Sequence, residues 1–257
     1  MTVDELKGRI ALVTGASRGL GRAIAVRLAQ AGAAVGVNYR EQAEAAEEVA
    51  REIRACGGRA LTVRADVADA AQVRDMVVRV VSELGDVDIL VNNAGVYQRG
   101  DLGDFDPGQL EAMRQVNVDG LVTVTYAVAG RMKERGFGRI VNVASVAGLG
   151  TAAAGTTFYA ATKAAVIVLT RRFAMELGPH GVTVNAVAPS FVPTDMNAAG
   201  RTAADFAGIA AKAMVRRVGK PEDIANAVAF LVSPESGFVT AQVLTVDGGR
   251  MDYIGHP

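Results

Sequence analysis

The sequence predicts an α/β protein, a single doubly wound domain around a seven-stranded parallel sheet. Short β-branched runs alternate with longer helical stretches along the 257 residues, and no linker, repeat or low-complexity segment interrupts the alternation. Parallel strands joined by helices of this length need right-handed crossovers, which cover both faces of the sheet. We therefore expect one domain over residues 1–257, with ligands bound beyond the carboxyl ends of its strands.

The seven expected strands are short apolar runs, namely Ile10–Thr14, Ala34–Asn38, Ala60–Arg64, Val87–Val91, Arg139–Ala144, Val182–Val187 and Val243–Val246. The helices expected between them begin near Gly19 and Asp69 or span Glu41–Ala55, Pro107–Glu134 and Phe158–Leu177. The longest irregular piece, residues 189–219, exceeds the usual length of a connection, so we expect a lid beside the ligand.

Composition narrows the class of partner. The 27 basic and 27 acidic residues cancel, so neither nucleic acid nor an anionic membrane is expected, and small molecules are. Cys56 is the only cysteine, which excludes an internal disulfide and fits a reducing compartment, and no His or Cys cluster predicts a catalytic metal. Without a signal-like segment or an apolar run of about 18 residues, we expect a cytoplasmic protein.

A glycine-rich turn follows the first expected strand and opens the first helix. Residues 14–21 read Thr-Gly-Ala-Ser-Arg-Gly-Leu-Gly. Backbone N–H groups and the helix dipole favour a pyrophosphate at such a turn, while the glycines permit the tight bend, the approach of the phosphate and close helix packing. We therefore predict a Rossmann-type dinucleotide site here.

The spacing Gly15-xxx-Gly19-x-Gly21 resembles that of the short-chain dehydrogenase/reductase family. The resemblance extends through Asp66-Val67, which implies an adenine contact, and Asn92-Asn93-Ala94-Gly95, which implies a turn lining the cofactor. The segment Val246-Asp247-Gly248-Gly249 also fits. Within the family the chain looks most similar to 3-oxoacyl-[acyl-carrier-protein] reductases and to sugar-type dehydrogenases.

Tyr159 and Lys163 are the strongest candidates for catalysis. They stand four residues apart on an expected helix and so share one face, and of the five tyrosines only Tyr159 has a lysine at this spacing. An ammonium nearby is expected to favour the phenolate and so to lower the pKa of Tyr159 from about 10. Ser145, at the end of the fifth strand, is placed to hydrogen-bond the substrate oxygen while Tyr159 handles its proton.

The resemblance implies a fourth catalytic residue, and the sequence differs from the family's usual pattern at two places. It implies that Asn117 holds a water in a proton relay to Lys163, and that Lys163 also binds the nicotinamide ribose. Ser145 and Tyr159 are 14 positions apart, one more than is usual in the family, and we place the extra residue in the loop 152–157. Ser190 stands after Pro189 where the family usually has glycine.

Two arginines predict a preference for NADP(H) over NAD(H). Arg18 and Arg40 would face a 2′-phosphate, and Asn38 at the end of the second strand offers no carboxylate to grip a ribose diol. The alternative is that Arg40 pairs with Glu41 or Glu44. The residues expected to contact the cofactor are Thr14, Gly15, Ser17, Arg18, Gly19, Leu20, Gly21, Asn38, Arg40, Asp66, Val67, Asn93, Ala94, Gly95, Tyr159, Lys163, Pro189 and Thr194.

These residues favour a reductase acting on a 3-oxoacyl thioester or similar ketone. A sugar or polyol dehydrogenase is the alternative, as is a non-catalytic cofactor-binding module, against which the intact catalytic set argues. The run Ala164–Leu169 is apolar on more than one helix face, which predicts a homo-oligomer, in this family a tetramer. The basic pairs Arg131 with Lys133 and Arg171 with Arg172 either dock an acyl carrier protein or form a solvated face.

Overall fold

The computed structural model describes residues 5–150, 153–194 and 200–250, and it has the predicted seven-stranded sheet. The strand order is β3-β2-β1-β4-β5-β6-β7, and every neighbouring pair is parallel. The strands are β1 Ile10–Val13, β2 Ala34–Tyr39, β3 Ala60–Arg64, β4 Ile89–Asn92, β5 Gly138–Val143, β6 Val182–Pro189 and β7 Val243–Val246. The doubly wound α/β prediction is confirmed.

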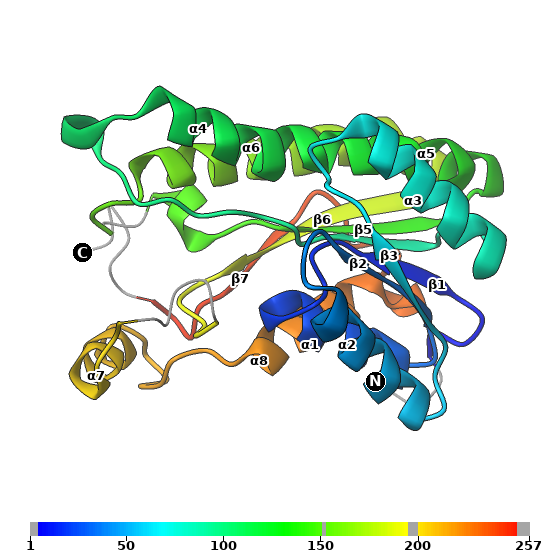
Figure 1. Ribbon diagram of the computed structural model, residues 1–257, viewed down its shortest axis with the longest axis horizontal. Helices are drawn as coiled ribbons and strands as arrows, with labels where there is room; N and C mark the ends of the chain where they lie inside the picture. Colours follow the sequence, from blue (N-terminus) through cyan, green and yellow to red (C-terminus); the bar gives the residue numbers. More distant parts are fainter. Residues whose placement is uncertain (1–4, 151–152, 195–199, 251–257) are drawn as a thin grey trace.

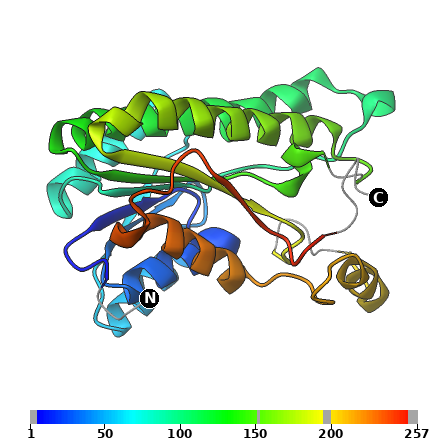
Figure 2. The same cartoon turned by 180° about the vertical axis from the view of Figure 1, so that it is seen from behind.

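Helices cover both faces of the sheet (Figures 1 and 2). On one face lie α1 Gly19–Gln30, α2 Ala43–Ala55 and α8 Pro221–Val232, and on the other α3 Ala70–Glu83, α4 Pro107–Arg114, α5 Leu121–Arg135 and α6 Thr157–Leu177. Successive residues of β1 point to opposite faces, so Ala11 and Val13 join the core beneath α1 while Leu12 joins the core beneath α3. No helix in the described ranges is both long and apolar enough to span a bilayer.

Three helical features differ from the prediction. The long helix expected over 107–134 is divided by a turn of π-helix, Gln115–Gly120, between α4 and α5. The helix α8 was not predicted. The expected irregular lid contains α7, Ala203–Ala211, which begins with a capping box between Thr202 and Asp205. Small side chains and a short length hide α7 from a periodicity search.

Residues 189–219, the segment expected as a lid, begin at the end of β6. Its helix, α7, lies apart from the two helical layers (Figure 1). Residues 195–199 lie outside the described residues. Both ends of the segment are tied to the chain that follows β7. Near the start, the Arg250 guanidinium donates to the Ser190 hydroxyl over 3.1 Å. Near the end, the Met214 amide donates to the Gly249 carbonyl over 3.1 Å. The segment expected as a lid is therefore attached near both of its ends to the chain that follows β7.

Candidate active site

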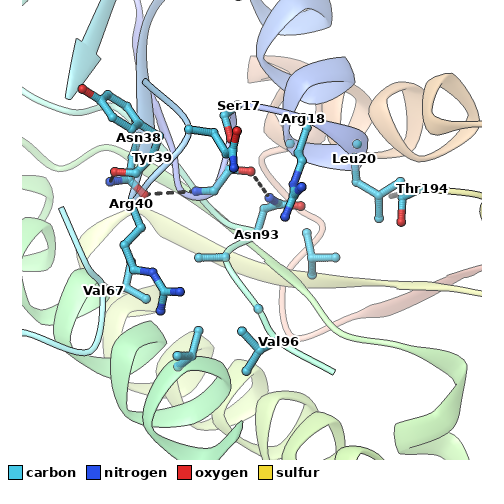
Figure 3. Close-up of a pocket in the computed structure, with 18 of the residues that line it drawn as sticks. Ser17, Arg18, Leu20, Asn38, Tyr39, Arg40, Val67, Asn93, Val96 and Thr194 are labelled. Atoms are coloured by element: carbon cyan, nitrogen blue, oxygen red, sulfur yellow. Dashed lines mark hydrogen bonds between the residues drawn. The ribbon is translucent and has the colours of Figure 1, made fainter. Parts of the chain in front are cut away.

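The carboxyl ends of β1, β2, β4, β5 and β6 meet at one cavity of about 320 Å³ (Figure 3). As in other doubly wound sheets, the crevice lies where the strand order reverses, beside β1 and β4. The predicted residues that line it are Gly15, Ser17, Arg18, Gly19, Leu20, Gly21, Asn38, Arg40, Asp66, Val67, Asn93, Ala94, Gly95, Ser145, Tyr159, Lys163, Pro189 and Thr194. Four separate sequence motifs are thus brought to a single site.

The glycine turn fits a dinucleotide phosphate. The helix α1 begins at Gly19, its N-cap residue makes no side-chain cap hydrogen bond, and the residues of its first turn line the cavity, where helix amide groups favour a phosphate. At Gly21 a Cβ atom would lie 2.4 Å from the Gly15 carbonyl oxygen and 2.5 Å from the side-chain nitrogen of Asn93. Only glycine allows the turn to fold back this closely.

Asn93 and Thr14 hold the turn in place from behind. The Asn93 side-chain amide donates to the Thr14 carbonyl over 2.8 Å and to the Gly15 carbonyl over 3.0 Å. In return the Thr14 hydroxyl accepts the Asn93 and Ala94 amides at 2.9 and 3.0 Å. Thr14 is buried and does not line the cavity, so its expected role as a cofactor contact is replaced by a supporting one.

Asn38 lines the cavity, but its side chain is used within the protein. Its oxygen accepts the Gly15 amide over 3.0 Å, and its nitrogen donates to the Val63 and Ala65 carbonyls at 3.3 and 3.1 Å. Asn38 is also buried. Asn38 therefore lies at the cavity, as expected of a residue near the cofactor, and these hydrogen bonds also make it a brace between β1, β2 and β3.

The two arginines expected to read the 2′-phosphate both line the cavity (Figure 3). Arg40 reaches from the end of β2 toward Val67, and its guanidinium lies 2.7 Å from a carboxylate oxygen of Glu41 and 3.6 Å from one of Asp66. These pairs are half-exposed, so each is weak, about 0 to 1 kcal/mol. Pairing with Glu41 thus exists, but it leaves Arg40 at the cavity wall.

The catalytic candidates come from β5 and α6. Ser145 follows β5 as the cap of a short 3₁₀ turn, and its hydroxyl oxygen accepts the Ala147 amide over 3.1 Å, which leaves its hydrogen free to donate. Tyr159 lies in the first turn of α6 and lines the same cavity as Ser145. Lys163 is buried one turn further on, where its ammonium donates to the Val143 carbonyl over 2.8 Å. The hydroxyl pair therefore faces the cavity above a buried amine.

The pKa of Tyr159 is shifted in the direction opposite to the one expected. Burial raises it to about 12, although the hydrogen bond from Ser145 acts to lower it. The Lys163 nitrogen lies 5.7 Å from the centre of the phenol ring and points to Val143, while burial lowers the pKa of Lys163 to about 8. In this structure Tyr159 therefore keeps its proton at neutral pH, as a proton donor requires.

Asn117 lies in the turn of π-helix and does not line the cavity. Its side-chain oxygen accepts the Val96 amide over 2.8 Å, and its nitrogen donates to the Val96 carbonyl and to the Thr162 hydroxyl at 2.9 and 3.0 Å. The side chain thus fixes the Gly95–Val96 turn against α6, next to Lys163. The water relay implied for Asn117 remains a prediction.

Comparisons with known proteins agree with this geometry. A family model described as enoyl-(acyl carrier protein) reductase matches residues 15–250. The short-chain reductase protein NovJ of Streptomyces niveus is 43% identical, over 94% of this chain and 93% of its own length. The chain belongs to the short-chain dehydrogenase/reductase family. A 3-oxoacyl-[acyl-carrier-protein] reductase from Synechocystis sp. is 40% identical, over 96% and 98% of the two chains.

A similar solved structure has the same fold. It is a gluconate 5-dehydrogenase from Burkholderia cenocepacia in complex with NADP and tartrate, with a TM-score of 0.89, 39% identity and coverage of 95% and 96% of the two chains. Because the chain belongs to this family, it is an oxidoreductase.

Several residues of the short-chain dehydrogenase/reductase site were not predicted from the sequence. These lining residues are Tyr39, Glu41, Gln42, Ala65, Val96, Val116, Val143, Ala144, Ser190 and Val192. Most of them end a strand or lie within three residues after one, so their position at a carboxyl end was the available signal. Within the described residues no cluster of three metal-binding side chains is present.

Proposed function

We propose that this protein is an NADP(H)-dependent carbonyl reductase acting on a 3-oxoacyl thioester or a similar ketone. The observation that carries the proposal is the pair of hydroxyls, Ser145 and Tyr159, which both line the cofactor cavity beside the buried Lys163. Two adjacent hydroxyls can donate to the same oxygen, which is what a carbonyl group needs as negative charge develops on it.

In the proposed reaction both hydroxyls donate to the substrate oxygen and polarise the carbonyl. When bound, NADPH supplies the hydride to the carbonyl carbon. As charge develops on the oxygen, Tyr159 transfers its phenolic proton to it and completes the alcohol, while the Lys163 ammonium stabilises the resulting phenolate. The protonated state of Tyr159 at neutral pH favours this direction over oxidation of the alcohol.

Lys163 predicts a pH dependence of cofactor binding. Because burial lowers its pKa from 10.5 to about 8, its charge is present below about pH 8 and is lost as the pH rises through that value. If the ammonium holds the nicotinamide ribose, the affinity for NADPH should fall above about pH 8 by up to roughly tenfold, since a charged donor is stronger by about 1.4 kcal/mol. Fluorescence titration of wild type and Lys163→Met checks this, and an equally steep fall in the variant would exclude Lys163 as the cause.

Arg40 predicts the choice of cofactor. Charge-assisted hydrogen bonds to a 2′-phosphate are worth about 1.5 to 3 kcal/mol, so NADPH should be preferred over NADH by roughly tenfold to a hundredfold. Arg40→Ala should reduce kcat/KM for NADPH by about the same factor and leave that for NADH nearly unchanged. Arg22→Ala, which removes an exposed arginine paired with Glu52 on α2, is the matched control. A preference for NADH in wild type would contradict the proposal.

A polyol or sugar dehydrogenase is the second candidate, and the gluconate 5-dehydrogenase with a similar structure supports it. A panel of 3-oxoacyl thioesters, simple ketones, and sugar or polyol substrates, followed by NADPH or NADP absorbance, separates the two. Turnover of the thioesters supports the first proposal, and turnover of the sugars alone supports the second. Tight cofactor binding without turnover of any substrate would instead indicate a non-catalytic binding module.

We also propose a homo-oligomer, in which paired helices bury apolar side chains that one subunit leaves exposed. Val168 and Met175 on α6 are 56% and 58% exposed, and Tyr126 on α5 is 84% exposed. Within the apolar run of α6, Val166 and Ile167 are buried in the subunit, so only part of the run remains for a partner. An assembly through α5 and α6 would cover the exposed residues.

The basic residues considered for carrier docking lie away from the cavity of their own subunit. Arg131, near the end of α5, pairs with Asp86, which precedes β4 at the amino edge of the sheet. Arg171 is 12 residues beyond Tyr159 on α6, about 18 Å along the helix. A carrier protein delivering substrate to this subunit's Tyr159 would therefore meet other residues first, and Arg131, Lys133, Arg171 and Arg172 more simply form a solvated face.

A further inference from the structure

Two segments far apart in the sequence meet beside Tyr159. Residues 97–101 follow β4 and its glycine turn, and residues 153–157 lead into α6. The bridge between Gly100 and Thr156 joins them in a parallel arrangement. None of the described residues in these two segments lines the cofactor cavity. We therefore expect their contacts with each other to affect the position of Tyr159 rather than the binding of the dinucleotide.

The contacts form a clasp centred on the main chain of Gly155. The Gly155 amide donates to both carboxylate oxygens of Asp101 at 2.9 Å, and the Thr157 hydroxyl donates to Asp101 at 3.0 Å. The Gly155 carbonyl accepts the Gly100 amide at 3.1 Å and the Tyr97 hydroxyl at 3.2 Å. Both polar groups of one loop residue are thus held by the opposite segment.

The clasp lies in the loop that is one residue longer than the family's usual spacing. An additional residue gives a loop more conformations to lose on ordering, so its end is less well fixed unless contacts compensate. Gly155 has φ +77°, a left-handed conformation that other residues rarely adopt, so the clasp favours glycine at this position. Because α6 begins at Thr157, the clasp sets the position of the helix turn that carries Tyr159.

Tyr97 connects the clasp to the catalytic phenol. Its ring meets that of Tyr159 edge to face, with centroids 5.2 Å apart and planes at 88°. Since the Tyr97 hydroxyl is donated to Gly155, it does not compete with Ser145 for the Tyr159 hydroxyl. We propose that Tyr97 is a positioning residue that holds the ring of Tyr159 in the orientation for proton transfer. This inference rests on the proposed function of Tyr159.

The experiment compares variants that remove the ring, the hydroxyl or the clasp. Tyr97→Leu removes the edge contact, and kcat should fall by about tenfold or more with the dissociation constant for NADPH unchanged. Tyr97→Phe keeps the ring and one of the two donors to Gly155, so its kcat should stay within about threefold of wild type. Asp101→Ala, which removes the acceptor of the Gly155 amide, should also lower kcat. Leu102→Ala, immediately after this segment and 82% exposed, is the control and should behave as wild type.

A second readout does not depend on turnover. In protein labelled with meta-fluorotyrosine, the fluorine NMR signal of Tyr159 is the one lost in Tyr159→Phe. It should move or broaden in Tyr97→Leu and stay in place in Leu102→Ala. An unchanged Tyr159 signal together with a wild-type kcat in Tyr97→Leu would overturn the inference. Absence of turnover by wild type on every substrate would refute the proposed function, whereas the NMR comparison would still test the positioning of Tyr159.

Discussion

Tyr159→Phe is expected to lower kcat by roughly a hundredfold to ten-thousandfold, the usual contribution of a positioned acid or base. The substitution removes one hydroxyl and leaves the ring, so the edge contact with Tyr97 and the start of α6 should survive. Cofactor affinity should change little, because a dinucleotide contacts many other groups of the cavity. Steady-state kinetics with NADPH and the best ketone of the panel, together with fluorescence titration of NADPH, measure both quantities.

The matched control for this prediction is Tyr126→Phe. Tyr126 lies on α5, is 84% exposed and is not among the cavity residues, so loss of its hydroxyl should leave kcat unchanged. Wild-type turnover by Tyr159→Phe would remove Tyr159 from the proton transfer and leave Ser145 as the remaining hydroxyl at the cavity. An equal loss in both variants would instead point to an effect on folding.

Gly21→Ala is expected to weaken NADPH binding by about fivefold to more than a hundredfold, which corresponds to an overpacking cost of about 1 to 3 kcal/mol. The new methyl group would lie 2.4 Å from the Gly15 carbonyl oxygen, and backbone atoms cannot move aside as the end of a flexible side chain can. The glycine turn must therefore open, which displaces the amide groups that face the phosphate. Isothermal titration with NADPH measures the loss, and thermal unfolding measures the accompanying destabilisation.

Gly130→Ala supplies the comparison for Gly21→Ala. Both glycines lie within helices, but a Cβ at Gly130 would meet no atom within 4 Å. Alanine there should stabilise the helix by about 0.5 to 1 kcal/mol and leave NADPH binding unchanged. If Gly21→Ala bound NADPH as tightly as Gly130→Ala does, the turn would not be the phosphate site.

The parts of the fold and site that were predictable are those encoded locally. Alternating apolar runs located every strand, and the glycine turn, Ser145, Tyr159 and Lys163 could be placed because each follows a strand or shares a helix face. The clasp could not be predicted in this way. Asp101 and Gly155 are 54 residues apart, and nothing in either segment alone indicates that they meet.

The error about Tyr159 has a related cause. The spacing of Tyr159 and Lys163 correctly puts both on one face of α6, but it does not show how deeply that face is buried or where the ammonium points. Burial raises the pKa of Tyr159 more than the Ser145 side chain lowers it, so the direction of the pKa shift follows from packing around the site. Asn38 and Thr14 show the same limit, because their hydrogen-bond partners lie on neighbouring strands.

The saturated side chain of Asn38 restricts how the coenzyme specificity of this scaffold could be redesigned. An engineer seeking an NADH-dependent form would first consider a carboxylate at the end of β2 to grip the ribose diol. At position 38 that carboxylate could not donate to the Val63 and Ala65 carbonyls, so both hydrogen bonds would be lost and a charge would be buried. Redesign should therefore begin at the exposed neighbour Arg40, where a new side chain would not disturb the attachment of the phosphate turn to the sheet.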